Sequence, residues 1–203
     1  GWGELAAVAD RMAAAVPRPG TEVGIVFRNR PATVALLLGV LRAGGCAVAV
    51  NPSRGRDRTR DDLADLDLPI VAGEAADLAD LVPDGARATT VATTGLDGDV
   101  VVTVGSAPPG PGRPGVAVRM LTSGTTGPPK RIDLGYVTFE RVMAGAKHYE
   151  SRRDAPLELR RGVAVVSAPL AHVGGLFRVL QCVLDGRSFA LLDRFDVETW
   201  VDA

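Results

Sequence analysis

The segment that decides the fold runs from Val23 to Val50 and reads VGIVF-RNR-PATVALLLGVLRA-GG-CAVAV. Its first and last five residues are short apolar runs typical of buried strands. Between them, Pro31–Ala43 is longer, apolar and opened by proline, as helices often are. The pair Gly44-Gly45 ends this helix before the strand Cys46–Val50. A strand, a helix and a second strand predict a βαβ unit, and hence an α/β fold with mostly parallel sheets flanked by helices.

The same alternation continues along the chain. Further strands are predicted at Pro69–Ala72, Asp99–Val104, Val116–Leu121, Ile132–Leu134, Gly162–Ser167 and Ser188–Leu192. Helices are predicted at Asp57–Leu66, at Ala75–Leu81, from a capping Thr138 to about Glu150, at Val173–Leu184 and from Asp196 onwards, with a charged loop at Ser151–Arg161. Residues 105–115 are too rich in proline and glycine for a regular element. This connector divides the chain into a first subregion, 1–104, and a second, 116–203.

Composition excludes several classes of protein. The chain has 203 residues, of which 46% are hydrophobic and 23% charged, as in globular proteins. Its 23 basic and 24 acidic residues give a net charge of −1, which argues against binding of nucleic acid through bulk charge. Arg42 and a glycine pair interrupt the longest apolar stretch, residues 32–50, so no integral membrane segment is predicted.

The two cysteines, Cys46 and Cys182, lie in apolar runs. Neither has a metal-binding spacing, and two thiols do not make a disulfide framework. A reducing, cytoplasmic location is therefore expected, and no metal ligands are predicted within the chain.

Residues 121–130, LTSGTTGPPK, could carry chemistry. After a predicted strand they hold four hydroxyl side chains, two glycines and Lys130, one of only two lysines in the chain. Glycines let backbone N–H groups approach an anion closely, hydroxyls add donors, and lysine adds a mobile positive charge. Two prolines separate Gly127 from Lys130, so the Walker A spacing is excluded. Composition alone leaves two interpretations open, a polyphosphate-binding loop and a polar turn.

This segment resembles the phosphate-binding signature of the adenylate-forming superfamily, which comprises acyl-CoA synthetases, luciferases and the adenylation domains of peptide synthetases. Arg131 departs from the signature, because the superfamily usually has glycine at that position. The matching residues are Thr122, Ser123, Gly124, Thr125, Thr126, Gly127, Pro129 and Lys130.

Two other segments carry the same resemblance. Residues 20–52 are similar to the first βαβ unit of the superfamily, with Asn29, Pro31 and Asn51-Pro52 at matching positions. Residues 169–176, PLAHVGGL, resemble a second motif that contains His172, although alanine replaces its usual aromatic residue. The resemblance covers essentially the whole chain and implies the amino-terminal part of an AMP-binding adenylation domain.

The resemblance also implies a reaction. A carboxylate attacks the α-phosphate of ATP to give acyl-adenylate and pyrophosphate, and a thiol, usually that of CoA, then takes the acyl group. Lys130 is the implied catalytic residue, because it would offset charge on the leaving pyrophosphate. The implied ATP phosphate-binding residues are Thr122, Ser123, Gly124, Thr125, Thr126, Gly127 and Lys130.

His172, Gly174 and Gly175 are the implied substrate-binding residues. Peptide-synthetase adenylation domains have an aspartate in this region that binds the α-amine of an amino acid. Residues 168–176 contain no acidic residue, so a hydrophobic carboxylic acid without an α-amine is the expected substrate.

The later motifs of the superfamily do not occur before Ala203. These include the magnesium-binding glutamate, the ribose-binding motif and the mobile carboxy-terminal domain. The chain is therefore interpreted as a partial AMP-binding domain, residues 1–203, that is inactive by itself. Its partners in the whole protein would be the acid, ATP with Mg²⁺, and CoA. Two alternatives are a ligase that loads a carrier protein and a non-catalytic or degenerate nucleotide-binding module.

Two motif-like patterns are interpreted as coincidental. Residues 110–115 satisfy G-x-G-x-x-G, but they are rich in proline and lead into a predicted strand instead of a helix. Asp61, Asp62 and Asp65 satisfy D-D-x-x-D, a diphosphate–magnesium pattern, but no second acidic cluster accompanies them. They are interpreted as a solvated helix face.

Overall fold

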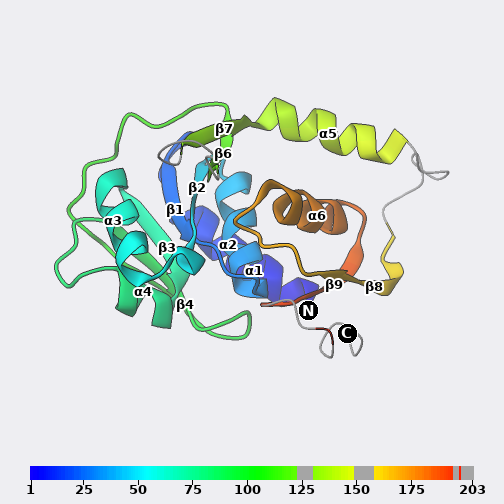
Figure 1. The fold of residues 1–203 in the computed structure, drawn as a ribbon, viewed down its shortest axis with the longest axis horizontal. Coiled ribbons are helices and arrows are strands. Elements are labelled where there is room, and N and C mark those ends of the chain that lie inside the picture. The colour runs from blue at the N-terminus through cyan, green and yellow to red at the C-terminus, as the bar shows by residue number, and fades with distance from the viewer. Residues whose placement is uncertain (123–129, 149–157, 194–196, 198–203) are drawn as a thin grey trace.

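The computed structural model describes residues 1–122, 130–148, 158–193 and 197 (Figure 1). In this part of the chain, seven strands form the main sheet in the order β5-β4-β3-β1-β2-β6-β7. The two edge strands, β5 and β7, are antiparallel to their neighbours, and the inner pairs are parallel. The strands are β1 (Glu22–Val26), β2 (Cys46–Val50), β3 (Ile70–Glu74), β4 (Thr89–Thr93), β5 (Val100–Thr103), β6 (Val116–Leu121) and β7 (Arg131–Gly135).

Helices cover both faces of this sheet. On one face lie α1 (Trp2–Ala14) and α2 (Pro31–Arg42), and on the other lie α3 (Arg56–Leu66) and α4 (Ala75–Leu81) (Figure 1). Successive side chains of a strand point to opposite faces. Ile25 and Ala49 accordingly join the core under α1 and α2, whereas Val26 and Val48 join a second cluster with Leu78 of α4. The predicted α/β class with a mostly parallel sheet is confirmed.

Helix α2 is apolar nearly all round because it is covered on nearly every side. It packs on β1, β2 and β3 and is crossed by α1. At Gly39 the two helices approach so closely that a Cβ atom would lie 2.5 Å from the carbonyl oxygen of Ala9. Glycine at this position therefore permits the contact between α1 and α2.

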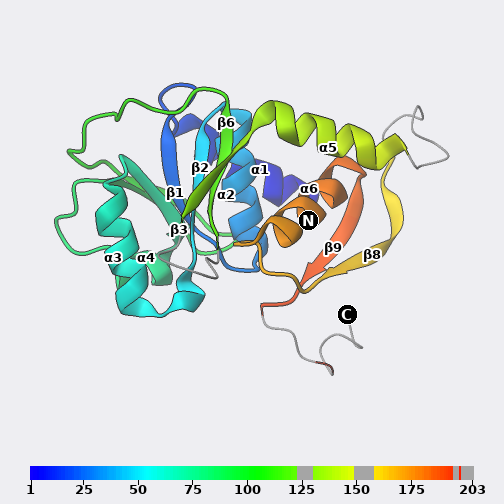
Figure 2. The same cartoon turned by 45° about the horizontal axis from the view of Figure 1, so that its top comes forward.

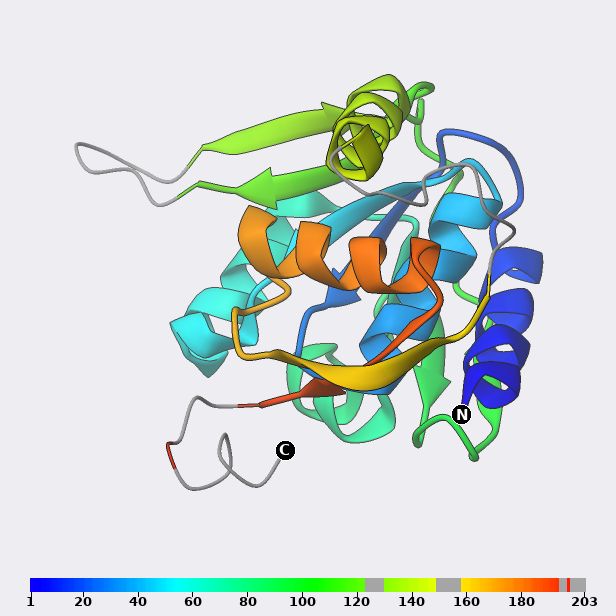
Figure 3. The same cartoon turned by 90° about the vertical axis from the view of Figure 1, so that its right-hand side faces the viewer.

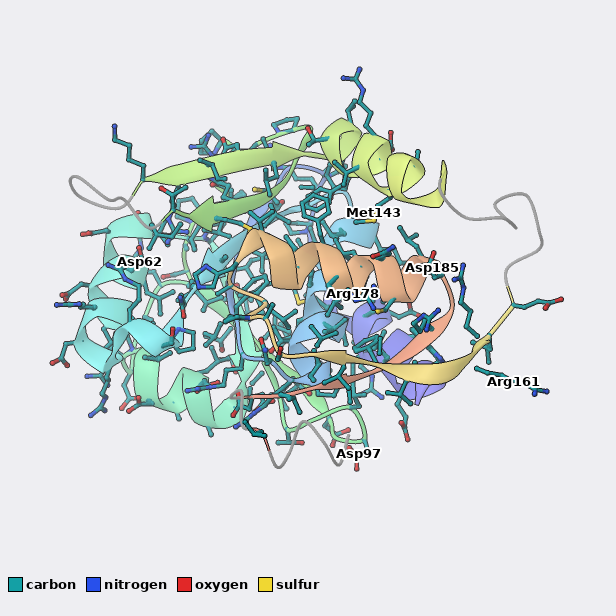
Figure 4. All side chains as sticks on the ribbon, turned by 45° about the vertical axis from the view of Figure 1, so that its right-hand side comes forward. Asp62, Asp97, Met143, Arg161, Arg178 and Asp185 are labelled. Carbon is teal, nitrogen blue, oxygen red and sulfur yellow. The ribbon has the colours of Figure 1, made fainter. Side chains whose placement is uncertain are left out.

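A second layer follows β7. Helix α5 (Tyr136–His148) leads to a separate parallel pair, β8 (Arg160–Val166) and β9 (Arg187–Leu191), joined by α6 (Val173–Leu184) (Figure 2). The rings of Phe139 in α5 and Phe177 in α6 stack with centroids 4.8 Å apart. Met143 lies on the side of α5 that is turned toward α6 (Figure 4).

Most predicted elements are found. The bounds of Val116–Leu121, Ala75–Leu81 and Val173–Leu184 are confirmed as predicted, and residues 105–115 form no helix or strand. Because residues 110–115 lead into β6, their G-x-G-x-x-G pattern lacks the helix of a dinucleotide site.

Several features differ from the sequence-based expectations. Helix α1, strand β4 and the short 3-10 helix η1 (Pro52–Arg54) were not predicted. Helix α5 begins at Tyr136, so Thr138 is its third residue and not its cap. Strand β8 includes Arg160 and Arg161, which were predicted to end the charged loop. The loop from 151 to 157, the helix end near Glu150 and the helix start at Asp196 lie outside the described residues.

No helix among the described residues is both long and apolar enough to cross a membrane.

Candidate functional site

The stem of the predicted phosphate loop is the end of the β6–β7 pair. Leu121 closes β6 and pairs with Arg131, the first residue of β7. Beyond them, both the backbone N–H and the hydroxyl of Thr122 donate hydrogen bonds of 2.8 Å to the carbonyl oxygen of Lys130. These two bonds hold the ends of the signature together and leave the Lys130 side chain exposed.

The other signature residues, Ser123, Gly124, Thr125, Thr126 and Gly127, lie outside the described residues, so their phosphate contacts stay a prediction. The same holds for the predicted phosphate contact of Thr122, whose hydroxyl closes the stem here. The stem follows the carboxyl end of β6, beside the carboxyl end of β2. In open α/β sheets, this edge is where ligands bind.

Arg131 joins this stem to the body of the domain. Its Nη1 donates to the carbonyl oxygen of Ala49 in β2 at 2.9 Å, and its Nη2 lies 2.5 Å from Oδ2 of Asp62 in α3. The exposed fractions of the two side chains are only 10% and 18%. The interpretation of the aspartates as a solvated helix face is therefore wrong for Asp62, although Asp61 and Asp65 are exposed. Sequence reasoning missed this pair, which joins residues 69 positions apart.

His172 lies where β8 turns into α6. Its backbone N–H donates to the carbonyl oxygen of Pro169 at 2.9 Å, and its carbonyl oxygen accepts from Leu176 at 3.1 Å. His172 is therefore the N-cap residue directly before α6, and it is exposed. Figures 1 and 3 show α6 beginning on the side of the molecule where β6 ends and β7 begins.

The two predicted substrate glycines differ in their surroundings. A Cβ atom on Gly174 would meet no atom within 4 Å. A Cβ atom on Gly175 would lie 2.3 Å from the carbonyl oxygen of Pro169 and 2.5 Å from that of Ala168. Gly175 thus lets α6 approach the turn that carries His172, whereas the space beside Gly174 is open.

We expect Gly175→Ala to destabilise the full-length protein by about 1–3 kcal/mol, because the clashing atoms belong to the backbone and cannot rotate away. Denaturant unfolding measures the change. Gly174→Ala is a matched control in the same helix turn, and it should leave stability unchanged or raise it slightly. Equal stability of the two variants would contradict the assigned packing role of Gly175.

Asn29 connects the two layers of the structure beside this turn. Its Nδ2 donates to the carbonyl oxygens of Ala168, at 3.1 Å, and Leu192, at 2.9 Å, while its Oδ1 accepts from the N–H of Leu170 at 2.8 Å. The residue is only 7% exposed. Asn29 therefore fixes the turn before His172 to the carboxyl end of β1. The sequence placed Asn29 in a matching motif but assigned it no contact.

Charged residues surround Asn29 in the chain. The Arg28 guanidinium forms a two-pronged hydrogen bond with Asp77 of α4, and this contact raises the pKa of Arg28. Arg30 pairs with Glu74 at the end of β3, and this contact raises its pKa as well. Both arginines therefore stay charged, and both hold the edge of the sheet together through neighbouring carboxylates.

Among the side chains that the structure describes, in residues 1–122, 130–145 and 158–193, no group of three or more His, Cys, Asp and Glu could hold a metal ion. Both cysteines are buried and free, and burial raises the pKa of the Cys46 thiol to about 12.

Comparison with known proteins identifies the family. The model of the AMP-binding enzyme family matches residues 1–203. The chain is 31% identical over 147 residues to the AMB antimetabolite synthetase AmbB of Pseudomonas aeruginosa, covering 72% of this chain and 12% of that protein. It is 28% identical over 131 residues to the nonribosomal peptide synthetase GRA1 of Gibberella zeae, covering 63% of this chain and 2% of that protein.

A solved structure shares the fold. It is O-succinylbenzoate Coenzyme A synthetase (MenE) of Bacillus subtilis in complex with ATP and a magnesium ion, at a TM-score of 0.68 and 19% identity. The match covers 99% of this chain and 53% of that one, so the chain spans about half of this structure and a small part of the curated relatives. The family match over the full chain, and not the fold alone, decides the assignment: the chain belongs to the AMP-binding family of adenylate-forming enzymes.

Proposed function

We propose that the whole protein is an ATP-dependent ligase that activates a carboxylic acid as its acyl-adenylate, and that residues 1–203 are the amino-terminal part of its AMP-binding domain. One observation carries this proposal. The phosphate-binding signature ends in an exposed Lys130 at the carboxyl edge of a parallel sheet, with its ends held together by Thr122. Such an edge with glycines and hydroxyl groups suits a polyphosphate.

In the proposed reaction, a carboxylate oxygen of the acid bonds to the α-phosphorus of ATP, and the bond from that phosphorus to the bridging oxygen of pyrophosphate breaks. Negative charge grows on the departing pyrophosphate. Lys130 would offset this charge, and backbone N–H groups and hydroxyls of the signature would hold the phosphates. Catalysis by this chain therefore consists of positioning and electrostatic stabilisation. Mg²⁺ would neutralise phosphate charge, with its glutamate ligand expected beyond residue 203.

For the acid, we propose a hydrophobic molecule without an α-amine. The supporting residues are the exposed His172 and the open space beside Gly174. No acidic side chain occurs in residues 168–176 to pair with an ammonium group, and an unpaired buried charge is unfavourable. The carboxylates of Asp77 and Glu74, at the end of the sheet that carries Asn29, are already paired with Arg28 and Arg30.

We expect Gly174→Leu to shorten the longest acid that the protein accepts, because the leucine side chain would fill the open space beside α6. Pyrophosphate release from the full-length protein with a panel of fatty, aromatic and free α-amino acids measures the change. ATP binding should survive, and Gly174→Ala should keep the wild-type preference. Strong activity with a free amino acid and weak activity with hydrophobic acids would overturn this choice of substrate.

For the acyl acceptor, we propose CoA. MenE is by name a Coenzyme A synthetase, and its structure shares the fold of this chain. A second candidate is the thiol of a carrier protein, which is favoured by the similarity to a nonribosomal peptide synthetase. The two are separated by offering either CoA or a phosphopantetheinylated carrier protein to the enzyme preloaded with acyl-adenylate. Thioester formed only on the carrier protein would replace the CoA proposal.

A further inference from the structure

Arg131 replaces the glycine that usually follows the signature lysine, and its side chain is turned into the structure. It contacts strand β2, which is not a neighbour of β7 in the sheet, and helix α3. Ala49 belongs to an interior strand, and Asp62 belongs to a helix on the face of α3 and α4. Figure 4 labels Asp62 on α3. An arginine at this position therefore adds connections that glycine could not make.

The contact with Ala49 lies just beyond the point where the backbone pairing between β2 and β6 ends. Pairing of β2 with β6 is confined to Ala47 with Val118 and Val48 with Arg119. The next carbonyl of β2, that of Ala49, accepts from Arg131 of β7 instead. The guanidinium thus reaches past β6 and fastens the edge strand to an interior strand. In the strand order β7 has β6 as its one neighbour, so this side-chain bond links β7 to a second strand.

Together these contacts fix both sides of Lys130. On one side, its carbonyl oxygen accepts two hydrogen bonds from Thr122. On the other side, Arg131 is held by the bonds of its guanidinium to Ala49 and Asp62. A glycine at that position would leave the backbone more conformational freedom. The rigid, planar fork of arginine suits a carbonyl and a carboxylate at once, which a lysine ammonium does not.

We propose that Arg131 is a positioning residue of the adenylation reaction, which holds the backbone of Lys130 through Ala49 and Asp62. This inference rests on the proposed function. Asp62 balances the charge of Arg131 away from the loop, so Lys130 supplies the positive charge that acts on pyrophosphate. The negative charge on pyrophosphate develops in the transition state. Misplacement of Lys130 should therefore lower kcat more than it raises the KM for ATP.

The test compares Arg131→Ala with wild type in the full-length protein, by acid-dependent ATP–pyrophosphate exchange and by equilibrium binding of ATP. We expect a loss in kcat on the order of 100-fold, as for misplaced catalytic groups, with ATP affinity nearly unchanged. Arg131→Lys should recover part of the activity. Asp62→Asn should reduce activity in the same direction, because the guanidinium then keeps only its carbonyl partner. Circular dichroism confirms that each variant is folded at the assay temperature.

A double-mutant cycle distinguishes positioning from a general loss of stability. If Arg131 acts through Lys130, Arg131→Ala should change activity by less than about twofold once Lys130→Ala is present. Arg119→Ala is a matched control on the paired strand, because Arg119 is similarly buried and bonds two carboxylates, Glu22 and Asp133. Arg119→Ala should change activity by the same factor whether residue 130 is lysine or alanine.

The outcomes separate the two proposals. Equal losses from Arg131→Ala with and without Lys130, or a loss confined to the KM for ATP, would overturn the positioning role and leave the proposed function intact. Absence of acid-dependent exchange in the wild-type protein would contradict the proposed function itself, and an unchanged exchange rate in Lys130→Ala would contradict only the role of Lys130.

Discussion

Lys130→Ala is expected to lower acid-dependent ATP–pyrophosphate exchange by a factor of about 30 to 1000, which corresponds to about 2–4 kcal/mol of transition-state stabilisation. Folding should be unaffected, because the Lys130 side chain is exposed and only its carbonyl oxygen takes part in the stem. The carbonyl oxygen remains in the variant. Exchange rates and the free energy of unfolding, measured on the same preparations, check both parts.

Two controls sharpen this result. Lys130→Arg keeps the charge but changes its shape and reach, so it should be intermediate. Lys147→Ala removes the other lysine of the chain and should leave exchange unchanged. If all three variants exchanged pyrophosphate at the wild-type rate, the phosphate-binding role of the segment would have to be abandoned.

Asn29→Ala is expected to destabilise the protein by about 2–4 kcal/mol, because three backbone groups of the second layer lose their side-chain partner. The free energy of unfolding in denaturant measures this loss. The variant should also raise the KM for the acid more than the KM for ATP. The released backbone leads into His172, whereas the hydrogen bonds that close the stem join Thr122 to Lys130 and do not involve Asn29.

Asn29→Asp keeps the shape of the side chain and tests the direction of the hydrogen bonds. An ionised carboxylate would face the carbonyl oxygens of Ala168 and Leu192 with no proton to donate, so this environment raises its pKa in the folded state. The destabilisation should therefore be small below about pH 4, where the group is protonated in both states, and grow as the pH rises. A loss of stability independent of pH would contradict the assigned bonding.

Local sequence patterns correctly predicted those elements whose ends are marked by residues next to them in the sequence. Helix α6 begins after the exposed His172 turn and ends before Gly186, and both limits can be seen in the sequence. Helix α1 carries an equally clear signal in the sequence, because Leu5, Val8 and Met12 recur at helical spacing on one buried face. Its contact at Gly39 shows that it belongs to the core.

The missed features depend on contacts distant in sequence. Thr138 satisfied the local rule for a helix cap, yet α5 begins at Tyr136, whose hydroxyl donates to the carbonyl oxygens of Leu41 and Gly45. Partial burial of the phenol raises the pKa of Tyr136 to about 12. The two hydrogen bonds fix the start of the helix by tertiary structure. The contacts of Arg131 and Asn29 are of the same kind, because their partners lie dozens of residues away.

The candidate site shows the same division. The signature and its resemblance led to Lys130 and the family, because the pattern is contiguous. They could not show that the Thr122 hydroxyl closes the stem, nor that the two glycines after His172 have different surroundings. Those features depend on which backbone segments lie close together, and only the folded structure defines that arrangement.

The most direct test of adenylate formation is the exchange of labelled pyrophosphate into ATP by the full-length protein, with and without a hydrophobic carboxylic acid. The exchange reports reversal of the step in which the acyl-adenylate and pyrophosphate form, and it needs neither CoA nor a carrier protein. We predict exchange that requires the acid and that is lost in Lys130→Ala. A protein that binds ATP but exchanges no pyrophosphate with any acid of the panel would be the non-catalytic module, and the assignment as an acid-activating ligase would be wrong.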